Sequence, residues 1–136
     1  MIGRLLGLFA CVALLGASAS PPIQGSGIRG EWRNTKNTVH LRVGPCGAAL
    51  CGTVIWAADK QRADARKGSG KELVGSLLLR DLRPHGNASW RGKIYIPDID
   101  TTASATAVQL SPKLIRVSGC GLFGLACRTQ HWHRIG

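Results

Sequence analysis

Two histidines in this chain have the type and spacing that suit metal binding. His131 and His133 lie two residues apart in a strand-like run, so their imidazoles would share one face and could chelate a metal ion. No carboxylate and no third histidine lies near them in the sequence. Surface histidines on either side of an inward Trp132 explain the pair more simply, and we therefore predict no metal site.

Two aspartates provide the other pattern that could do chemistry. Asp98 and Asp100 follow Pro97 and, in an extended chain, would present two carboxylates on one face for acid–base catalysis or for calcium. A turn capped by Asp explains them more simply. The sequence contains no Gly-x-Ser-x-Gly nucleophile motif and no phosphate-binding loop. We predict that the protein is not an enzyme and has no catalytic residue and no cofactor; a hydrolase or isomerase using either aspartate is the alternative.

Four cysteines form two couples, each around a glycine-containing apex between strand-like runs. Each couple can close its own hairpin, so we predict the disulfides Cys46–Cys51 and Cys120–Cys127. Such bridges need an oxidising compartment. The spacings are not the two-residue knuckles that tetrahedral zinc favours, which argues against a structural metal.

The first residues have the three parts of a secretory signal peptide over 1–19. These are the basic Arg4, an apolar run over 5–15 and small residues over 17–19 before the cleavage point. The apolar run is shorter than the roughly 20 residues that a membrane-spanning helix needs. We predict a periplasmic or secreted protein with no transmembrane anchor in its mature form.

After the leader, residues 20–29 read as a flexible lead-in and residues 30–136 as one domain. Short β-type runs alternate with turn residues through this domain, and several alternate apolar with polar side chains. This spacing favours an antiparallel sandwich or barrel. We predict eight strands, over 30–33, 38–43, 52–57, 76–83, 89–96, 104–110, 114–120 and 128–135.

The charged segment from Asp59 to Glu72 is long for a hairpin connection. Its charged part is the one stretch after the leader that could be a helix, but Gly68, Ser69 and Gly70 interrupt it, so we predict no helix there. Long connections in compact barrels are often lids or binding loops. A solvated excursion is the other interpretation.

The chain is strongly basic, with 18 Lys and Arg against 7 Asp and Glu and a net charge of +11. Of these, only Arg4 lies in the leader, so its removal lowers the charge to +10. Such a charge attracts anionic envelope surfaces, or is simply a solvated surface, since the basic residues are scattered. No recognition helix, zinc finger or aromatic strand pair accompanies them, which argues against nucleic acid.

Four aromatic side chains are the candidates for a ligand site: Trp56, Trp90, Tyr95 and Trp132. In an eight-stranded barrel the interior is filled with side chains or holds one small ligand. Aromatic side chains bury large apolar areas, so these four would line a cavity or its mouth. A filled core is the alternative.

Several short motifs occur in a fixed order along the chain: Gly30-x-Trp32-Arg33, Cys46-Gly47, Leu50-Cys51-Gly52-x-Val54-Ile55-Trp56, Leu73-Val74-Gly75, Trp90-x-Gly92-Lys93-Ile94-Tyr95-x-Pro97, Gly119-Cys120 and Cys127-Arg128-Thr129-Gln130-x-Trp132-x-Arg134. Together they resemble the bacterial family called domain of unknown function 2147, over essentially the whole mature chain. The resemblance implies an exported all-β protein with a lipocalin-like, calycin-type antiparallel up-and-down barrel and no established activity.

The resemblance also implies how the barrel closes. In calycins, the Trp of the opening Gly-x-Trp closes the floor while an Arg of the last strand lies across its indole. Gly30, Trp32 and Arg134 occupy those positions here, and Arg128 is the substitute candidate for the cation. Where many members carry Asp-Pro and a nearby Gly after the Tyr, this chain has Ile96-Pro97 and Asp100, so no role passes to the missing carboxylate.

These observations lead to one function and one alternative. We predict a non-catalytic, lipocalin-like binding protein for a small apolar or amphipathic ligand. The alternative is a structural or interaction protein of the cell envelope, with a filled core, that associates with anionic surfaces through its basic charge.

Overall fold

The computed structural model describes Gly16, residues 27–121 and residues 126–136. Apart from Gly16, the predicted signal peptide over 1–19 lies outside these residues, and so does most of the predicted lead-in over 20–29. Within them, no helix has both the length and the apolar character needed to cross a bilayer.

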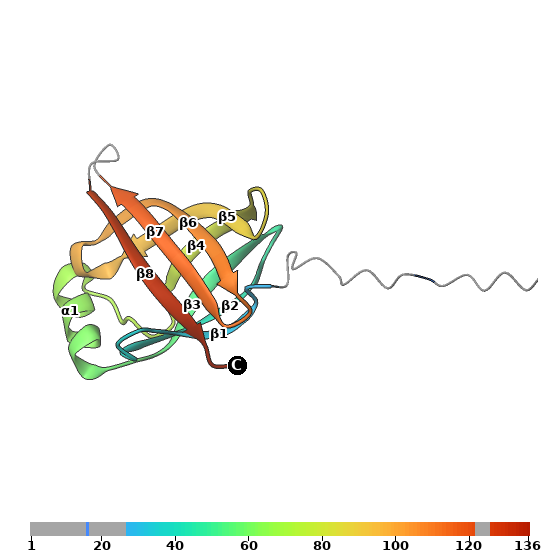
Figure 1. Cartoon of the computed structure of the whole chain (residues 1–136). Helices are drawn as coiled ribbons and strands as arrows, with labels where there is room; N and C mark the ends of the chain where they lie inside the picture. Colours follow the sequence, from blue (N-terminus) through green and yellow to red (C-terminus); the bar gives the residue numbers. More distant parts are fainter. Residues whose placement is uncertain (1–15, 17–26, 122–125) are drawn as a thin grey trace, which may run out of the picture.

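Eight strands, one α-helix and one 3-10 helix make up the described chain (Figure 1). In chain order they are β1 (Gly30–Asn34), β2 (Val39–Cys46), β3 (Ala49–Ala57), α1 (Asp59–Ser69), β4 (Leu77–Pro84), β5 (Ser89–Ile96), η1 (Pro97–Ile99), β6 (Thr101–Ser111), β7 (Leu114–Gly121) and β8 (Ala126–Arg134).

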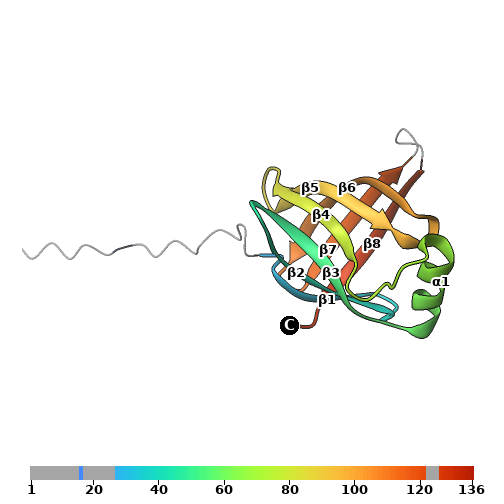
Figure 2. The same ribbon diagram turned by 180° about the vertical axis from the view of Figure 1, so that it is seen from behind.

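The eight strands form a closed barrel in which each strand pairs antiparallel with the next (Figures 1 and 2). β8 returns to pair with β1, where Trp32 lies opposite Arg134. The prediction of an all-β up-and-down barrel is therefore confirmed. Among the described strands, closure pairs both sides of every strand and so avoids the unpaired sheet edge that invites aggregation.

The two ends of the barrel differ. One end, here called the terminal end, carries the β2–β3, β4–β5 and β6–β7 connections and the C-terminus (Figure 1). The opposite end, the helix end, carries the β1–β2 turn, α1 and η1.

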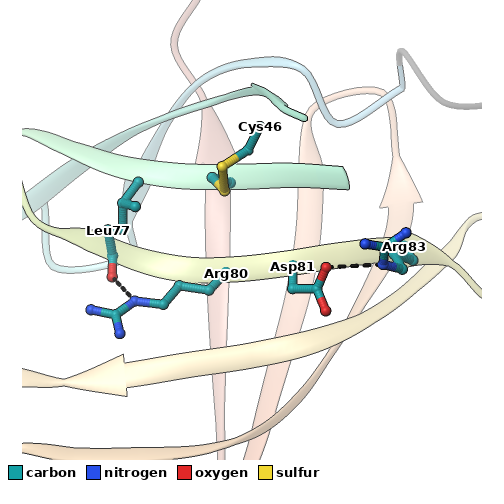
Figure 3. Close-up of a disulfide and its surroundings, with 6 residues drawn as sticks. Cys46, Leu77, Arg80, Asp81 and Arg83 are labelled. Carbon is teal, nitrogen blue, oxygen red and sulfur yellow. Dashed lines mark hydrogen bonds and ion pairs between the residues drawn. A yellow bond between two sulfur atoms is a disulfide. The ribbon is translucent and has the colours of Figure 1, made fainter. Parts of the chain in front are cut away.

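One disulfide lies at each end, and both predicted pairings are confirmed. Cys46–Cys51 joins β2 to β3 at the terminal end, with 5.5 Å between the Cα atoms (Figure 3). Cys120–Cys127 joins directly opposite residues of β7 and β8 at the helix end, with a Cα separation of 4.1 Å. Each bridge ties a short hairpin, so it constrains the neighbouring connection more than the barrel as a whole.

The core lies inside the barrel, on one face of each strand. β6 shows the alternation most simply, since Ala103, Ala105, Ala107 and Gln109 are buried while the residues between them are exposed or half-buried. The largest fully buried side chains are those of Trp32, Trp90, Ile28, Leu41, Leu79, Leu82, Ile115, Val54 and Val117.

The barrel floor is closed by Trp32 and Arg134. Arg134 Cζ lies 4.3 Å from the centre of the Trp32 ring, as the family resemblance implied. The indole Nε1 donates to Ile28 O at 2.9 Å, and the guanidinium donates to Arg29 O at 2.7 Å and Pro112 O at 2.8 Å. Three chain segments therefore converge on one cation–π pair.

Gly30 leaves room for this closure. Its φ is +133°, and a Cβ built there would lie 2.5 Å from both Arg134 Nη1 and Gly136 O. A residue with a side chain would need a rare backbone conformation and would push the guanidinium off the indole. The Gly-x-Trp motif is thus a packing requirement.

The prediction of no helix over the charged segment is wrong: Asp59–Ser69 forms α1. Gly68 lies inside the helix, in its last turn. A glycine is required there because a Cβ would collide with the backbone of Asp98 and Pro97, where α1 packs on η1. Gly70 is the left-handed C-cap at φ 73°, and its N–H donates to Arg66 O. The glycines that argued against a helix are needed for its packing and its end.

Replacement of Gly68 by Ala tests this explanation. In an isolated helix the change would stabilise by about 1 kcal/mol. Here we expect a lower free energy of unfolding, because the added methyl group would collide with backbone atoms of η1, which cannot turn aside as a flexible side chain can. Denaturant unfolding measures the difference, and the exposed Lys67→Ala on the same helix should stay within about 0.5 kcal/mol of the parent. A stabilised Gly68→Ala protein would contradict the packing argument.

A second substitution tests the floor. Arg134→Lys keeps the charge but cannot hold the planar fork of hydrogen bonds. We expect a loss of about 1–3 kcal/mol in the free energy of unfolding, since charge-assisted bonds to carbonyls are lost. The control is Arg128→Lys, at an exposed β8 position opposite Gly119, which should leave stability unchanged. Equal effects of the two changes would show that Arg134 has no special role.

Candidate functional site

The structure does not bring the four candidate aromatic residues to one place. Trp90 and Trp132 are buried, with exposed fractions of 2% and 4%, and contribute to the core inside the barrel. Trp56 is 44% exposed and lies opposite His40 on the outer face. Tyr95 is half-buried beneath Arg80, close to η1.

Trp90 and Trp132 pack with Trp32 in the hydrophobic core. Neither the Trp90 Nε1 nor the Trp132 Nε1 has a hydrogen-bond partner among the described residues. Buried donors without partners are uncommon and cost stability. Their role as ligand-binding residues stays a prediction.

Trp56 borders a hollow of about 720 Å³ at the helix end of the barrel. We call it the β3–α1 groove, because it lies between the end of β3, the first turns of α1 and the segment that precedes β4. Its lining residues are Ile55, Trp56, Ala57, Ala58, Asp59, Arg62, Glu72 and Val74. This is the volume of a small-molecule site.

A β-bulge shapes the apolar wall of the groove. His40 pairs with Trp56 while the next residue, Leu41, pairs with Val54, so Ile55 is an extra residue in β3. A bulge of this kind bends a strand and changes the direction of the neighbouring side chains. Ile55 and Trp56 therefore both reach the groove, although strict alternation would separate them.

The Trp56 indole is held from one side. Its ring centre lies 4.6 Å from that of His40, with the planes tilted by 43°. His40 is in turn held by a 2.7 Å hydrogen bond between its Nε2 and Asn37 Oδ1. A large exposed aromatic ring is thus positioned before any ligand arrives, which lowers the entropy cost of binding.

Backbone hydrogen bonds attach the segment before β4 to β3. The N–H of Gly75 donates to Val54 O at 2.8 Å, and the N–H of Val54 donates to Ser76 O at 2.9 Å. Leu73 is buried, and Val74 is 37% exposed toward the groove. The segment that brings Val74 to the groove is therefore attached to the barrel wall.

The polar rim is an ion-pair network. Glu72 accepts hydrogen bonds from Arg62 Nε at 2.9 Å and Arg66 Nη2 at 2.6 Å. The bond from Arg62, then the one from Arg66, lowers the pKa of Glu72 from 4.5 to about 2. Asp59, in the first turn of α1, adds a second carboxylate to the lining. The groove thus combines an apolar wall with ionic groups whose positions are set by α1.

Tyr95 takes part in a different cluster. Its hydroxyl donates to Asp100 Oδ1, and Arg80 Cζ lies 4.6 Å from its ring centre. The hydrogen bond to Asp100 is the main cause of its raised pKa. Asp100 caps η1 with φ 47°, so this aspartate sits in a turn, and the contact ties η1 to β5.

The two histidines considered for a metal lie apart from the groove, on β8. His131 is exposed, and His133 Nε2 lies 3.1 Å from Thr35 Oγ1. In the part of the chain that the structure describes, no group of three or more His, Cys, Asp or Glu side chains is placed to hold a metal ion.

Sequence reasoning named Trp56 as a ligand candidate and the segment from Asp59 to Glu72 as a lid, a binding loop or a solvated excursion, but it did not name the lining residues of β3 and Val74. Ile55 was hidden because the bulge breaks the alternation that strand patterns rely on. Arg62 and Glu72 are ten residues apart and meet only because α1 folds back toward β4. The charged segment was expected to be a lid or a solvated excursion; it forms one wall of the groove, and its motion as a lid stays a prediction.

Comparison with known proteins gives one family and one structure. The sequence model of a family described as "Uncharacterized protein conserved in bacteria (DUF2147)" matches residues 30–134. No curated protein gives a significant match. Protein HP1028 from Helicobacter pylori, described as belonging to the lipocalin family, has a similar structure, with a TM-score of 0.61 and 18% identity over 79% of this chain and 82% of that chain. At this identity the likeness concerns the fold alone.

The ion-pair rim predicts a pH dependence. Because the pKa of Glu72 is lower in the folded protein, its stabilising effect is complete above pH 4.5 and is lost as the pH falls toward about 2. We expect Glu72→Gln to have a smaller fall in melting temperature than the parent over that window. Lys67→Gln, on α1 but outside the network, should behave like the parent. Identical pH profiles for the parent and Glu72→Gln would contradict the pairing.

Proposed function

We propose that this chain, which belongs to the bacterial family DUF2147, is a lipocalin-like binding protein that holds a small amphipathic molecule in the β3–α1 groove. The observation that carries the proposal is Trp56, a large exposed aromatic ring held against His40 at the edge of a 720 Å³ hollow. Ligand pockets are typically lined by hydrophobic and aromatic side chains together with a few polar groups, and the lining of this hollow has that composition.

The lining indicates the chemical class of the ligand. Ile55, Trp56 and Val74 offer an apolar wall, and removing their surface from water favours binding by about 25 cal/mol per Å². Asp59 and the Arg62–Glu72 pair offer donors and acceptors at the opposite edge. A molecule with an apolar body and one polar end fits both parts.

The same residues favour binding over catalysis. A general acid or base works best with a pKa near the working pH. Two arginines hold the pKa of Glu72 at about 2, so it stays ionised and fixed. Its role in the proposal is to orient α1 and Arg62 and to accept hydrogen bonds.

The disulfides support an exported location. Both Cys46–Cys51 and Cys120–Cys127 need an oxidising compartment to persist. We place the working protein in the periplasm or outside the cell, where it would bind its ligand.

Titration with a dansylated undecanoic acid, followed by the fluorescence of the probe, tests the proposal. We expect saturable binding that Trp56→Ala weakens about tenfold, because most of the aromatic contact area is lost. The matched control is Leu110→Ala, which removes a side chain of similar exposure, 45%, on β6 and outside the groove.

Two outcomes would overturn the assignment. If Trp56→Ala and Leu110→Ala bind the probe as tightly as the parent, the groove is not the site. If the parent binds neither this acid nor a neutral dansylated alkane, the class of ligand is wrong. Circular dichroism of each variant separates lost binding from lost folding.

A further inference from the structure

The outer face of the barrel over β5–β8 carries no acidic side chain. The chain's seven acidic residues are Glu31, Asp59, Asp64, Glu72, Asp81, Asp98 and Asp100, and none lies in these four strands. Arg91, Lys93 and Arg116 are exposed there. No acidic side chain of these four strands therefore balances their positive charge.

Strand register places these cations on the outer surface. Trp90, Ala107 and Val117 are buried and lie opposite one another in register, which sets the inner face. The next position on each strand points the other way. Arg91, Thr106, Ser118 and Thr129 form such an outward row across β5, β6, β7 and β8.

The row continues onto β4 as pairs of like charges. Arg83 lies directly opposite Arg91, and Arg80 lies opposite Lys93. Like charges at directly opposite positions destabilise a sheet. Asp81 on β4 pairs with Arg83, with 2.9 Å between Asp81 Oδ1 and Arg83 Nε (Figure 3). Asp100 accepts a hydrogen bond from the hydroxyl of Tyr95, whose ring Arg80 covers. An anion lying across β4 and β5 would relieve this repulsion.

Hydroxyl groups complete the surface. Ser118 Oγ and Thr129 Oγ1 lie 3.2 Å apart in the row that Arg91 begins. Hydroxyl groups and guanidinium groups both donate hydrogen bonds to carboxylate or phosphate oxygens. We call the residues Arg80, Arg83, Arg91, Lys93, Thr106, Arg116, Ser118 and Thr129 the basic face.

The shape and composition of the basic face indicate one kind of partner. The strands are about 4.8 Å apart, so five strands spread the groups over roughly 19 Å of a convex wall. A flexible polymer can follow this curve, whereas a flat bilayer would touch only part of it. Among the residues of the face there is no aromatic ring on which a nucleic-acid base could stack, and Arg80 covers the ring of the nearby Tyr95.

We propose that the basic face binds a linear acidic polysaccharide through its repeating carboxylate or phosphate groups. The contact is electrostatic, with hydroxyl donors beside the cations, and needs no base stacking and no membrane insertion. It uses a different wall of the barrel from the β3–α1 groove and stands independently of it.

The test compares two triple variants with the same change in net charge. Arg91→Gln, Lys93→Gln and Arg116→Gln together remove three cations from the basic face. Lys36→Gln, Lys67→Gln and Lys71→Gln together remove three exposed cations elsewhere. Binding to polygalacturonate, and to polyglycerol phosphate for the phosphate form, is measured from 0.05 to about 0.5 M salt.

We expect the first triple variant to bind at least about tenfold more weakly and with a smaller salt dependence, because fewer counterions are released. The second should stay within about threefold of the parent, since overall charge acts weakly at a distance in salt. Equal losses of affinity in the two triple variants would contradict binding at the basic face. Tighter binding of the parent to oligothymidine or to phosphatidylglycerol vesicles would overturn the polysaccharide assignment. Equal melting temperatures of the two variants show that both are folded.

Discussion

The seam between β1 and β8 is the contact on which the barrel depends. Three residue pairs join these strands, and Trp32 opposite Arg134 is the pair that lies on the floor. The guanidinium stacks on the indole and donates to carbonyls before β1 and after β6, so one side chain joins three segments that are distant in sequence. This side chain supports a short seam, and without the seam β8 and β1 would present free edges.

Closure of the barrel also separates the core from the two surfaces for which we propose binding. The terminal end is filled by Trp32, Trp90 and Trp132, so the interior there is core. The helix end has longer connections, which include α1 and η1, and these two helices pack on each other. The β3–α1 groove and the basic face lie on the outer side of the barrel, so the binding that we propose for them does not involve the core. A barrel of this kind serves as a scaffold for surface sites.

Strand patterns predicted much of the fold, and the misses have physical causes. The eight strands, the barrel and the family resemblance are confirmed, because alternation and turn residues report local burial directly. The disulfides follow from cysteines that flank hairpin apices. The helix α1 was missed because Gly68 reads as a breaker until η1 is seen against it. Trp56 was identified as a ligand candidate for its size, but its partners on the bulge and on α1 were not.

Residue types at short spacing or in a fixed order were enough to predict the class of fold, the disulfide pairs and the family. Which aromatic rings are core and which are exposed became known from the folded chain, because burial depends on the register of strands that meet across the barrel. It alone brought Glu72 to Arg62 and Arg66, and Arg91 opposite Arg83. The energy of a charge pair depends on the distance between the two charges in space, and the separation of the residues along the chain does not predict that distance.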